Sequence, residues 1–182
     1  APSAQLLARG AHVTAVDRSA ARLERLEKNM ERLGFEPRII EADVTKWCPN
    51  EPADVVMLDA PCSATGTARR HPDVLWSKSE TDIAQLAIVQ KRMISAAAKW
   101  VVPGGLLIFA TCSLQPEEGI DQVTPFLDAH PAFQFEPLTM SEVHGLAETL
   151  TPSGCFRSLP CHFPDHGGMD GFFAARFRRQ KG

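Results

Sequence analysis

The chain has 182 residues, 44% of them hydrophobic and 23% charged, which suits one globular domain large enough to bury a core. A formal net charge of −3 argues against a protein that holds nucleic acid by overall charge, so any such contact must be local or supplied by another part of the protein. No apolar run approaches a membrane span and no signal peptide is recognisable, so we expect a soluble, cytoplasmic chain. Because it starts at Ala1 and not at a methionine, we interpret it as a fragment.

The first half of the chain alternates between strand and helix patterns. His12–Asp17 is a β-branched run that predicts a strand, and apolar residues three or four apart predict a helix over Ala20–Leu33, closed by Gly34. Two further short strands are expected at Arg38–Glu41 and Asp54–Asp59, each ending in an acidic residue.

The longest helix is predicted over Ser79–Trp100, with Ser79 as its N-cap. Pro103-Gly104-Gly105 is expected to end it and to turn the chain into a buried strand at Leu106–Ala110. Proline in the first turn then favours a helix over Pro116–Ala129.

The last part of the chain is the least periodic. Residues 131–164 are rich in Pro, Ser, Thr and Gly and have no clear pattern, whereas Gly171–Arg178 predicts a closing strand. The alternation as a whole predicts an α/β fold with a mainly parallel sheet, in one domain covering residues 1–182.

The predicted strands end in acidic residues at Asp17 and Asp59, and Asp43 closely follows another strand. In open α/β sheets, ligands bind beyond the carboxyl ends of the strands, where a carboxylate can accept hydrogen bonds from a ribose. The alternative is that each is a helix N-cap or a turn former. No G-x-G-x-x-G loop follows the first of these strands, which argues against a dinucleotide.

The five cysteines are odd in number and form no C-x-x-C pair, so we expect free thiols, with neither a disulfide framework nor a metal site. Cys62 and Cys112 each follow a predicted strand on the edge where a ligand should lie. The ordinary alternative is a small buried hydrophobic residue.

A thiol at this edge would suit methylation of cytosine at carbon 5. Addition of a thiolate to carbon 6 breaks the aromaticity of the ring and leaves an enamine that can attack a sulfonium methyl group. Asp59, three residues before Cys62, could stabilise the charge that develops on the ring. By this chemistry alone, Cys62 and Cys112 are both plausible nucleophiles, and either could assist the other.

Three segments carry a family resemblance: DAPCSATGTARRHPDVLW (Asp59–Trp76), PGGLLIFATCSLQPEEG (Pro103–Gly119) and GGMDGFFAARFRR (Gly167–Arg179). Together they resemble the bacterial rRNA cytosine-C5 methyltransferases of the RsmB (Sun, Fmu) group, within the Nop2/Sun family of RNA methyltransferases. The resemblance implies a Rossmann-like methyltransferase fold with helices on both faces of the sheet, S-adenosylmethionine as the methyl donor, and RNA, expected to be small-subunit rRNA, as the substrate.

The resemblance also implies a role for each matching residue. Cys112 of the TCS motif would attack carbon 6, and Cys62 of the PCS motif would assist release of the methylated RNA. The presence of both motifs indicates RNA and not DNA as substrate. Asp17 would bind the cofactor ribose, Asp43 would lie by the adenine, and Asp59 would face the methionine end and the target base.

Basic residues stand in two places. Arg69, Arg70 and His71 resemble the family's substrate-side segment, although an Arg-Arg pair is often only a solvated surface. A second group is expected to form a basic tail: Arg176, Arg178, Arg179 and Lys181. Near it, Phe172 and Phe173 are expected to pack into the core.

The sequence departs from the family pattern at its start. Where the family's cofactor loop has A-A-P-G-G-K-T or a close variant, Ala1-Pro2 is followed directly by Ser3, and the first strand of the fold is also missing. We place Ala1 and Pro2 in the cofactor site and expect residues to be lost between Pro2 and Ser3. A Cα separation there above the 3.80 Å of a trans peptide would show such a break.

Two other functions stay open: a methyltransferase that acts on protein or small molecules, which would not need Cys112, and an RNA-binding or scaffold fragment without activity. We expect a monomer with no membrane contact.

Overall fold

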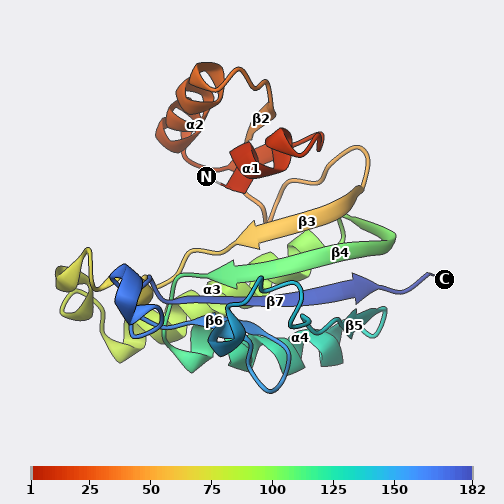
Figure 1. Ribbon diagram of the computed structural model, residues 1–182. Helices are drawn as coiled ribbons and strands as arrows, with labels where there is room; N and C mark the ends of the chain where they lie inside the picture. The colour runs from red at the N-terminus through yellow and green to blue at the C-terminus, as the bar shows by residue number, and fades with distance from the viewer. Residues whose placement is uncertain (1, 182) are drawn as a thin grey trace. The chain divides into compact units, whose positions relative to one another are not determined.

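Two units, residues 1–48 and 49–182, make up the chain in the computed structural model, which describes residues 2–181. The first unit (red to orange in Figure 1) contains α1 (Pro2–Ala8), β1 (Thr14–Asp17), α2 (Ala20–Arg32) and β2 (Arg38–Glu41). Strands β1 and β2 pair in parallel, with Asp17 opposite Glu41. The expected single domain over residues 1–182 stays a prediction.

Helix α2 forms as the apolar spacing predicts. The Ser19 side chain caps its first turn, and Leu23 and Met30, seven residues apart, are buried on one face while α2 contacts both strands. The chain leaves the helix at Gly34, whose φ of 73° lies in the left-handed region that favours glycine.

Helix α1 starts at Pro2 and runs through Ser3 without interruption. The prediction of lost residues between Pro2 and Ser3 is therefore wrong, since two residues of one helical turn are joined by an ordinary peptide. The chain lacks the Gly-Gly-Lys segment at this position. Ala1, the other residue expected in the cofactor loop, lies outside the described residues.

The second unit is built on a five-stranded sheet. Its strands are β3 (Ala53–Asp59), β4 (Val101–Thr111), β5 (Phe133–Phe135), β6 (Phe156–Ser158) and β7 (Phe172–Arg179). Its α-helices are α3 (Glu80–Ala98) and α4 (Val123–Ala129). Short 3₁₀ turns occur at η1 (Thr65–Thr67), η2 (Pro72–Leu75), η3 (Pro116–Glu118), η4 (Ile120–Gln122), η5 (Ala147–Thr149) and η6 (Pro164–His166). The strand order is β3-β4-β7-β5, with β6 also on β7 (Figure 1).

The α/β class is confirmed, but the sheet is mixed and not mainly parallel. Among the described residues, β1–β2 and β3–β4 are parallel, whereas β7 is antiparallel to β4, β5 and β6. Parallel strands need a crossover such as α3, whereas the chain before β7 has no long helix and returns antiparallel. Helices α3 and α4 contact each other and the strands of one face (Figure 1), so helices on both faces of this sheet are not found within residues 49–181.

Two expectations for this unit were wrong: the place of Pro103-Gly104-Gly105 after the long helix, and the single helix over 116–129. Helix α3 already ends at Ala98, and Pro103-Gly104-Gly105 lies inside β4, where the pairing with β3 shifts register. A bulge tolerates Pro, which cannot donate a ladder hydrogen bond, and Gly104 has a φ of 83°. The expected helix over 116–129 is instead η3 and η4 followed by α4, because the chain breaks at Gly119, which has non-helical dihedrals.

The core of the second unit lies between the sheet and these helices. Leu107, Phe109 and Phe177 are fully buried, and Leu107 pairs with Phe177 across β4 and β7. Phe126 of α4 packs on Phe177 with 4.6 Å between ring centroids. Phe173 is buried as predicted and meets Phe109 edge to face, whereas Phe172 is 38% exposed, so its predicted place in the core is wrong. Adjacent residues of a strand point to opposite faces, and only one of the pair can face this core.

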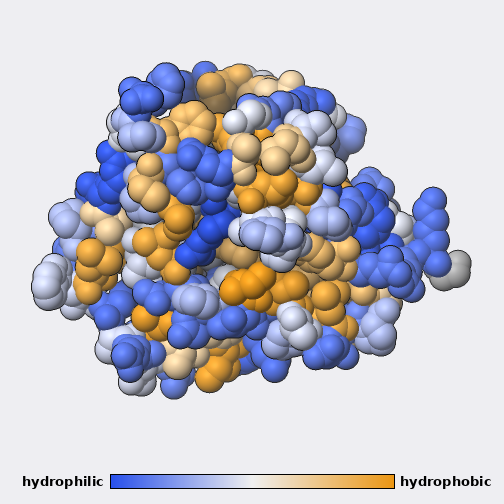
Figure 2. Space-filling view, turned by 60° about the horizontal axis from the view of Figure 1, so that its bottom comes forward, coloured by the Kyte–Doolittle hydropathy of each residue, from blue (hydrophilic) through white to orange (hydrophobic). Residues whose placement is uncertain are grey.

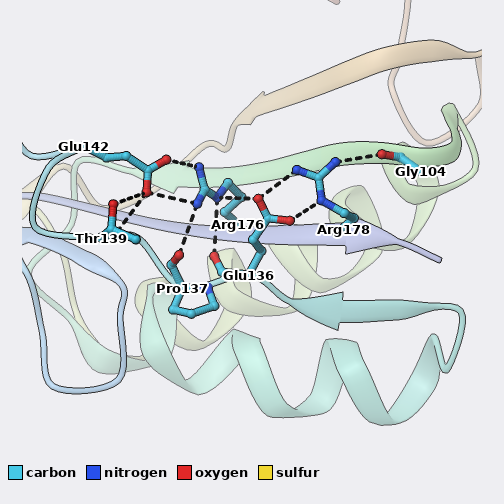
Figure 3. A network of polar contacts seen from close by, with 7 residues as sticks. All are labelled: Gly104, Glu136, Pro137, Thr139, Glu142, Arg176 and Arg178. Carbon is cyan, nitrogen blue, oxygen red and sulfur yellow. Dashed lines mark hydrogen bonds and ion pairs between the residues drawn. The ribbon is translucent and has the colours of Figure 1, made fainter.

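The expected basic tail is wrong for Arg176 and Arg178, which belong to β7 and are paired with acids (Figure 3). Arg176 lies 2.6 Å from Glu142 and lowers the pKa of that carboxyl to about 2. Arg178 donates to Glu136 at 2.8 Å and to the Gly104 carbonyl oxygen at 2.8 Å. These contacts tie β7 to residues 136–142 and to β4, and they neutralise much of the basic charge.

Hydrophobic residues stand among hydrophilic ones on the face that Figure 2 draws. Trp76 is 90% exposed, and Leu75 and Ile88 are each 56% exposed. None of the helices within residues 2–181 has the length and the apolar composition needed to cross a membrane.

Candidate active site

The parallel pairing of β3 and β4 brings the two cysteine loops together. Asp59 pairs with Ala110 at the carboxyl ends of the strands, and the Ala60 N–H donates to the Ala110 carbonyl oxygen at 3.0 Å. Cys62 and Cys112 therefore leave the sheet at the same edge, as the sequence predicts. Their Sγ atoms lie 3.3 Å apart, within hydrogen-bonding distance for sulfur.

The two thiols have unequal acidity. The hydrogen bond between them lowers the pKa of Cys112 and raises that of Cys62, and burial raises the pKa of Cys62 further. Burial and the charges of the Asp59 and Glu118 carboxylates oppose the lowering of the Cys112 pKa without reversing it. Of the two thiols, Cys112 is therefore the one that loses its proton more readily.

The segment of Arg69, Arg70 and His71 is anchored to the segment before β7. The Arg70 guanidinium donates hydrogen bonds from two of its nitrogens to the Asp170 carboxylate, with Nε 2.9 Å from Oδ2. This contact is the main cause that raises the pKa of Arg70, and the charge of Cys112 raises it further. Arg70 thus places a positive charge within electrostatic reach of the Cys112 thiolate. Arg69 and His71 are exposed beside it. The structure brings Arg70 near the thiols while leaving all three residues open to solvent.

Three backbone segments meet next to Cys112. The Gly66 N–H donates to the Cys112 carbonyl oxygen at 2.9 Å, and the Gly171 N–H donates to the Gly66 carbonyl oxygen at 2.8 Å. A Cβ on Gly66 would lie 2.1 Å from the Gly171 oxygen and 2.7 Å from the Cys112 oxygen. Only glycine permits this approach, which holds the TCS loop, η1 and the start of β7 together.

Gly66→Ala should therefore destabilise the fold by about 3 kcal/mol or more, because backbone atoms cannot move aside as a side chain can. Urea unfolding followed by circular dichroism measures the loss. Gly145→Ala is the control: its φ of 86° is left-handed, but its Cβ would meet nothing within 4 Å. Left-handed strain alone costs about 1–2 kcal/mol, so equal losses in the two variants would contradict the close-approach argument.

The candidate cofactor residues of the first unit make local hydrogen bonds. Asp17 Oδ1 accepts the Ser19 N–H at 2.8 Å, and Asp43 Oδ1 accepts from the Thr45 N–H and hydroxyl at 2.9 and 2.7 Å, which lowers the pKa of Asp43. Both residues are thus the turn formers that the alternative interpretation expected. The second oxygen of each carboxylate takes no part in these bonds. Pro2 lies in the first turn of α1.

Sequence patterns did not indicate two residues that hold the cysteine loops. Glu118, expected in the first turn of a helix, is fully buried, and so is Gln90 of α3. Their polarity alone predicts exposure, and only a contact with partners far along the chain reveals their place. Within residues 2–181, no three His, Cys, Asp or Glu side chains gather as metal ligands would.

Comparison with known proteins shows which family contains these two cysteine motifs. The family model for 16S rRNA methyltransferase RsmB/F matches residues 3–178. The chain belongs to this family. As the motifs around the two cysteines indicated, it is an RsmB/F-type methyltransferase chain.

Curated relatives of this RsmB/F chain include Ribosomal RNA small subunit methyltransferase B of Klebsiella pneumoniae, which is 38% identical over 94% of the chain. The protein of the same name from Shewanella oneidensis is 37% identical over 89% of the chain. The alignments cover 37% and 36% of these relatives, so the chain spans little more than a third of their length.

Solved structures confirm the Rossmann-like methyltransferase fold of the RsmB/F chain. PH0851 superposes with a TM-score of 0.80 at 30% identity, covering 92% of this chain and 37% of that one. NSun6 from Pyrococcus horikoshii, solved with SFG, superposes with a TM-score of 0.76 at 28% identity, covering 99% and 44%. The N-methyltransferase NodS in complex with S-adenosyl-l-homocysteine, at 12% identity and a TM-score of 0.53, shares the fold alone.

Proposed function

We propose that the protein methylates carbon 5 of cytosine in small-subunit rRNA through a covalent bond between Cys112 Sγ and carbon 6 of the base. One observation carries the proposal: two thiols 3.3 Å apart at the carboxyl edge of the sheet, of which Cys112 has the lowered pKa. The relatives are named for methylation of small-subunit ribosomal RNA, which supports this substrate.

In the proposed first step, the Cys112 thiolate donates its electron pair to carbon 6, and the electrons of the 5,6 double bond move toward carbon 5. The charge of Asp59 raises the pKa of Cys112, so this carboxyl group lies near the sulfur. In its protonated form it would donate to N3 of the base and so stabilise the negative charge that the addition places on the ring. Bound S-adenosylmethionine supplies the methyl group that carbon 5 takes up. The protein's contribution is to hold the thiolate and the carboxyl group in place for this addition.

In the proposed second step, a water molecule takes the proton from carbon 5, the electron pair of that bond restores the 5,6 double bond, and the bond from carbon 6 to Cys112 breaks with its electron pair on the sulfur, which restores the thiolate. Cys62 assists this release: as the hydrogen-bond donor to Cys112 Sγ, it stabilises the leaving thiolate. The nucleophile is thereby regenerated with Cys62 still protonated.

The carboxylates fit S-adenosylmethionine by their chemistry. The second oxygen of Asp17, which lies outside the bond to Ser19 and 3.7 Å from Arg22 Nη1, could accept from the ribose hydroxyls. We propose Asp43 for the adenine and Asp59 for the methionine end. Arg69, Arg70 and His71 are proposed to contact the RNA, because exposed cations bind phosphates. The missing Gly-Gly-Lys segment favours the alternative of a fragment without activity.

Deleting the gene should remove 5-methylcytosine from one position of the small-subunit rRNA, and mapping by bisulfite sequencing would find that position. The full-length protein should restore the mark, whereas its Cys112→Ala variant should not. Restoration by Cys112→Ala would favour a scaffold that recruits another enzyme. An unchanged map after deletion would contradict the proposed substrate.

A further inference from the structure

A buried polar cluster lies behind the two thiols, and the proposed reaction does not use it. Its five side chains come from the two cysteine loops, η1, α3 and η3, and each is at most 4% exposed: Ser63, Thr65, Gln90, Ser113 and Glu118. Buried polar groups are costly unless they are hydrogen-bonded, so a cluster of this size needs an internal organisation.

The Glu118 carboxylate is the acceptor at its centre. Oε1 accepts the Ser63 N–H at 2.9 Å and the Gln90 amide N–H at 3.1 Å, and Oε2 accepts the Ser63 hydroxyl at 2.5 Å. All three partners donate, which an ionised carboxylate can satisfy and an amide cannot. The Gln90 amide oxygen accepts no bond from the described residues, so its amide nitrogen alone holds that side chain.

The hydroxyl groups of Ser63, Thr65 and Ser113 link the Glu118 carboxylate to the loop of Cys112. Because the Ser63 proton points to Glu118, the Ser63 oxygen is left to accept, from the Ser113 hydroxyl at 3.1 Å or from the Thr65 hydroxyl at 3.4 Å. The Ser113 oxygen in turn accepts the Gln115 N–H at 3.0 Å, and the Thr65 oxygen accepts the Leu114 N–H at 2.9 Å. The hydrogen bonds thus run in one direction, from the TCS loop to the carboxylate.

The cluster reaches residues on both sides of each thiol. Ser63 follows Cys62, and Gln90 donates to the carbonyl oxygen of Pro61, which precedes it, at 2.9 Å. Ser113 follows Cys112, and the hydroxyl of Thr111, which precedes it, donates to the Glu118 carbonyl oxygen at 2.9 Å.

We propose that Glu118 is a positioning residue, which fixes the Cys62 loop against the Cys112 loop so that the two sulfur atoms stay 3.3 Å apart. Its effect on methyl transfer rests on the proposed function, whereas its effect on the distance between the thiols does not. In this role Glu118 acts through Ser63 and Ser113, the serines next to the two cysteines, and not by a contact with the base or the cofactor.

Glu118→Gln tests the proposal because it keeps the shape of the side chain but replaces one carboxylate oxygen by an NH₂ group. This group cannot accept the hydrogen bond that Ser63 or Gln90 donates at that position. Its matched control is Glu117→Gln, the same change at the exposed neighbouring residue. The full-length protein is treated with diamide, an oxidant of thiols. Diamide takes up two protons and two electrons from Cys62 and Cys112 and is reduced to the hydrazine, and the two sulfur atoms form a disulfide. Peptide mapping by mass spectrometry separates this disulfide from those of Cys48, Cys155 and Cys161.

We expect disulfide formation about ten-fold slower or more in Glu118→Gln and unchanged in Glu117→Gln, because the reaction needs the sulfurs in contact. In single-turnover methyl transfer, the rate should fall while the half-saturating RNA concentration stays within about two-fold. A purely structural role would lower the melting temperature and leave both readouts unchanged.

Ser113→Ala, which cuts the link to the TCS loop and leaves the Glu118–Ser63 contact intact, provides a second variant if Glu118→Gln does not fold. It should slow disulfide formation as well. Wild-type rates in a folded Glu118→Gln or Ser113→Ala, or no disulfide in the wild type, would overturn the proposal. A wild type that forms the disulfide but transfers no methyl group would instead refute the proposed function and leave the positioning role standing.

Discussion

Cys112→Ala should lose methyl transfer to RNA by about 10³-fold or more and should form no covalent adduct, because it removes the thiolate proposed to add to carbon 6 of the base. The wild-type rate should also persist to lower pH than an ordinary thiol allows, since the hydrogen bond from Cys62 lowers the pKa of Cys112 and keeps it as thiolate. Single-turnover transfer of a labelled methyl group, measured across a pH series, gives both quantities.

Cys161→Ala is the matched control, since Cys161 is exposed and belongs to neither cysteine loop. It should transfer methyl groups at the wild-type rate. A Cys112→Ala protein as fast as the control would rule out the covalent route and favour a methyltransferase acting on protein or a small molecule.

Cys62→Ala should trap the RNA on the protein. Without the thiol that donates to Cys112 Sγ, the leaving thiolate loses its stabilisation, so the methylated adduct should accumulate and migrate as a slower band on a denaturing gel. Because the same hydrogen bond lowers the pKa of Cys112, adduct formation in this variant should also need a higher pH.

The double variant Cys62→Ala/Cys112→Ala should give no such band, which identifies Cys112 as the attachment point. If the single variant releases its RNA as fast as the wild type, Cys62 has no part in release. An adduct that survives in the double variant would place the nucleophile elsewhere.

Local pattern predicted much of the fold. Helix α2 and strand β1 begin and end within about two residues of their predicted bounds, because apolar spacing, an N-cap serine and a closing glycine are local signals. Strands β5 and β6 escaped prediction, since each has three residues and exists only by pairing with β7. The segment 116–129 was misjudged because Gly119 interrupts a pattern that otherwise suits a helix.

The candidate site was predictable to a similar degree. Both thiols and Asp59 were expected at one sheet edge, because parallel neighbouring strands end on the same side. For Asp17 and Asp43 the sequence left two interpretations open, and the structure adds local bonds to both. Glu118 gave no signal, because its partners stand 28 and 55 residues away along the chain.

The sequence by itself determined the family and the candidates for the reactive groups, since motifs and strand-end positions are properties of short segments. Only the tertiary structure decided which thiol is the more acidic. That difference arises from a hydrogen bond between residues 50 apart in the chain and from the burial that raises the pKa of Cys62, and the charge of Asp59 opposes it. Hydrogen bonds and electrostatic interactions depend on distance in space, which strand pairing sets and sequence spacing does not.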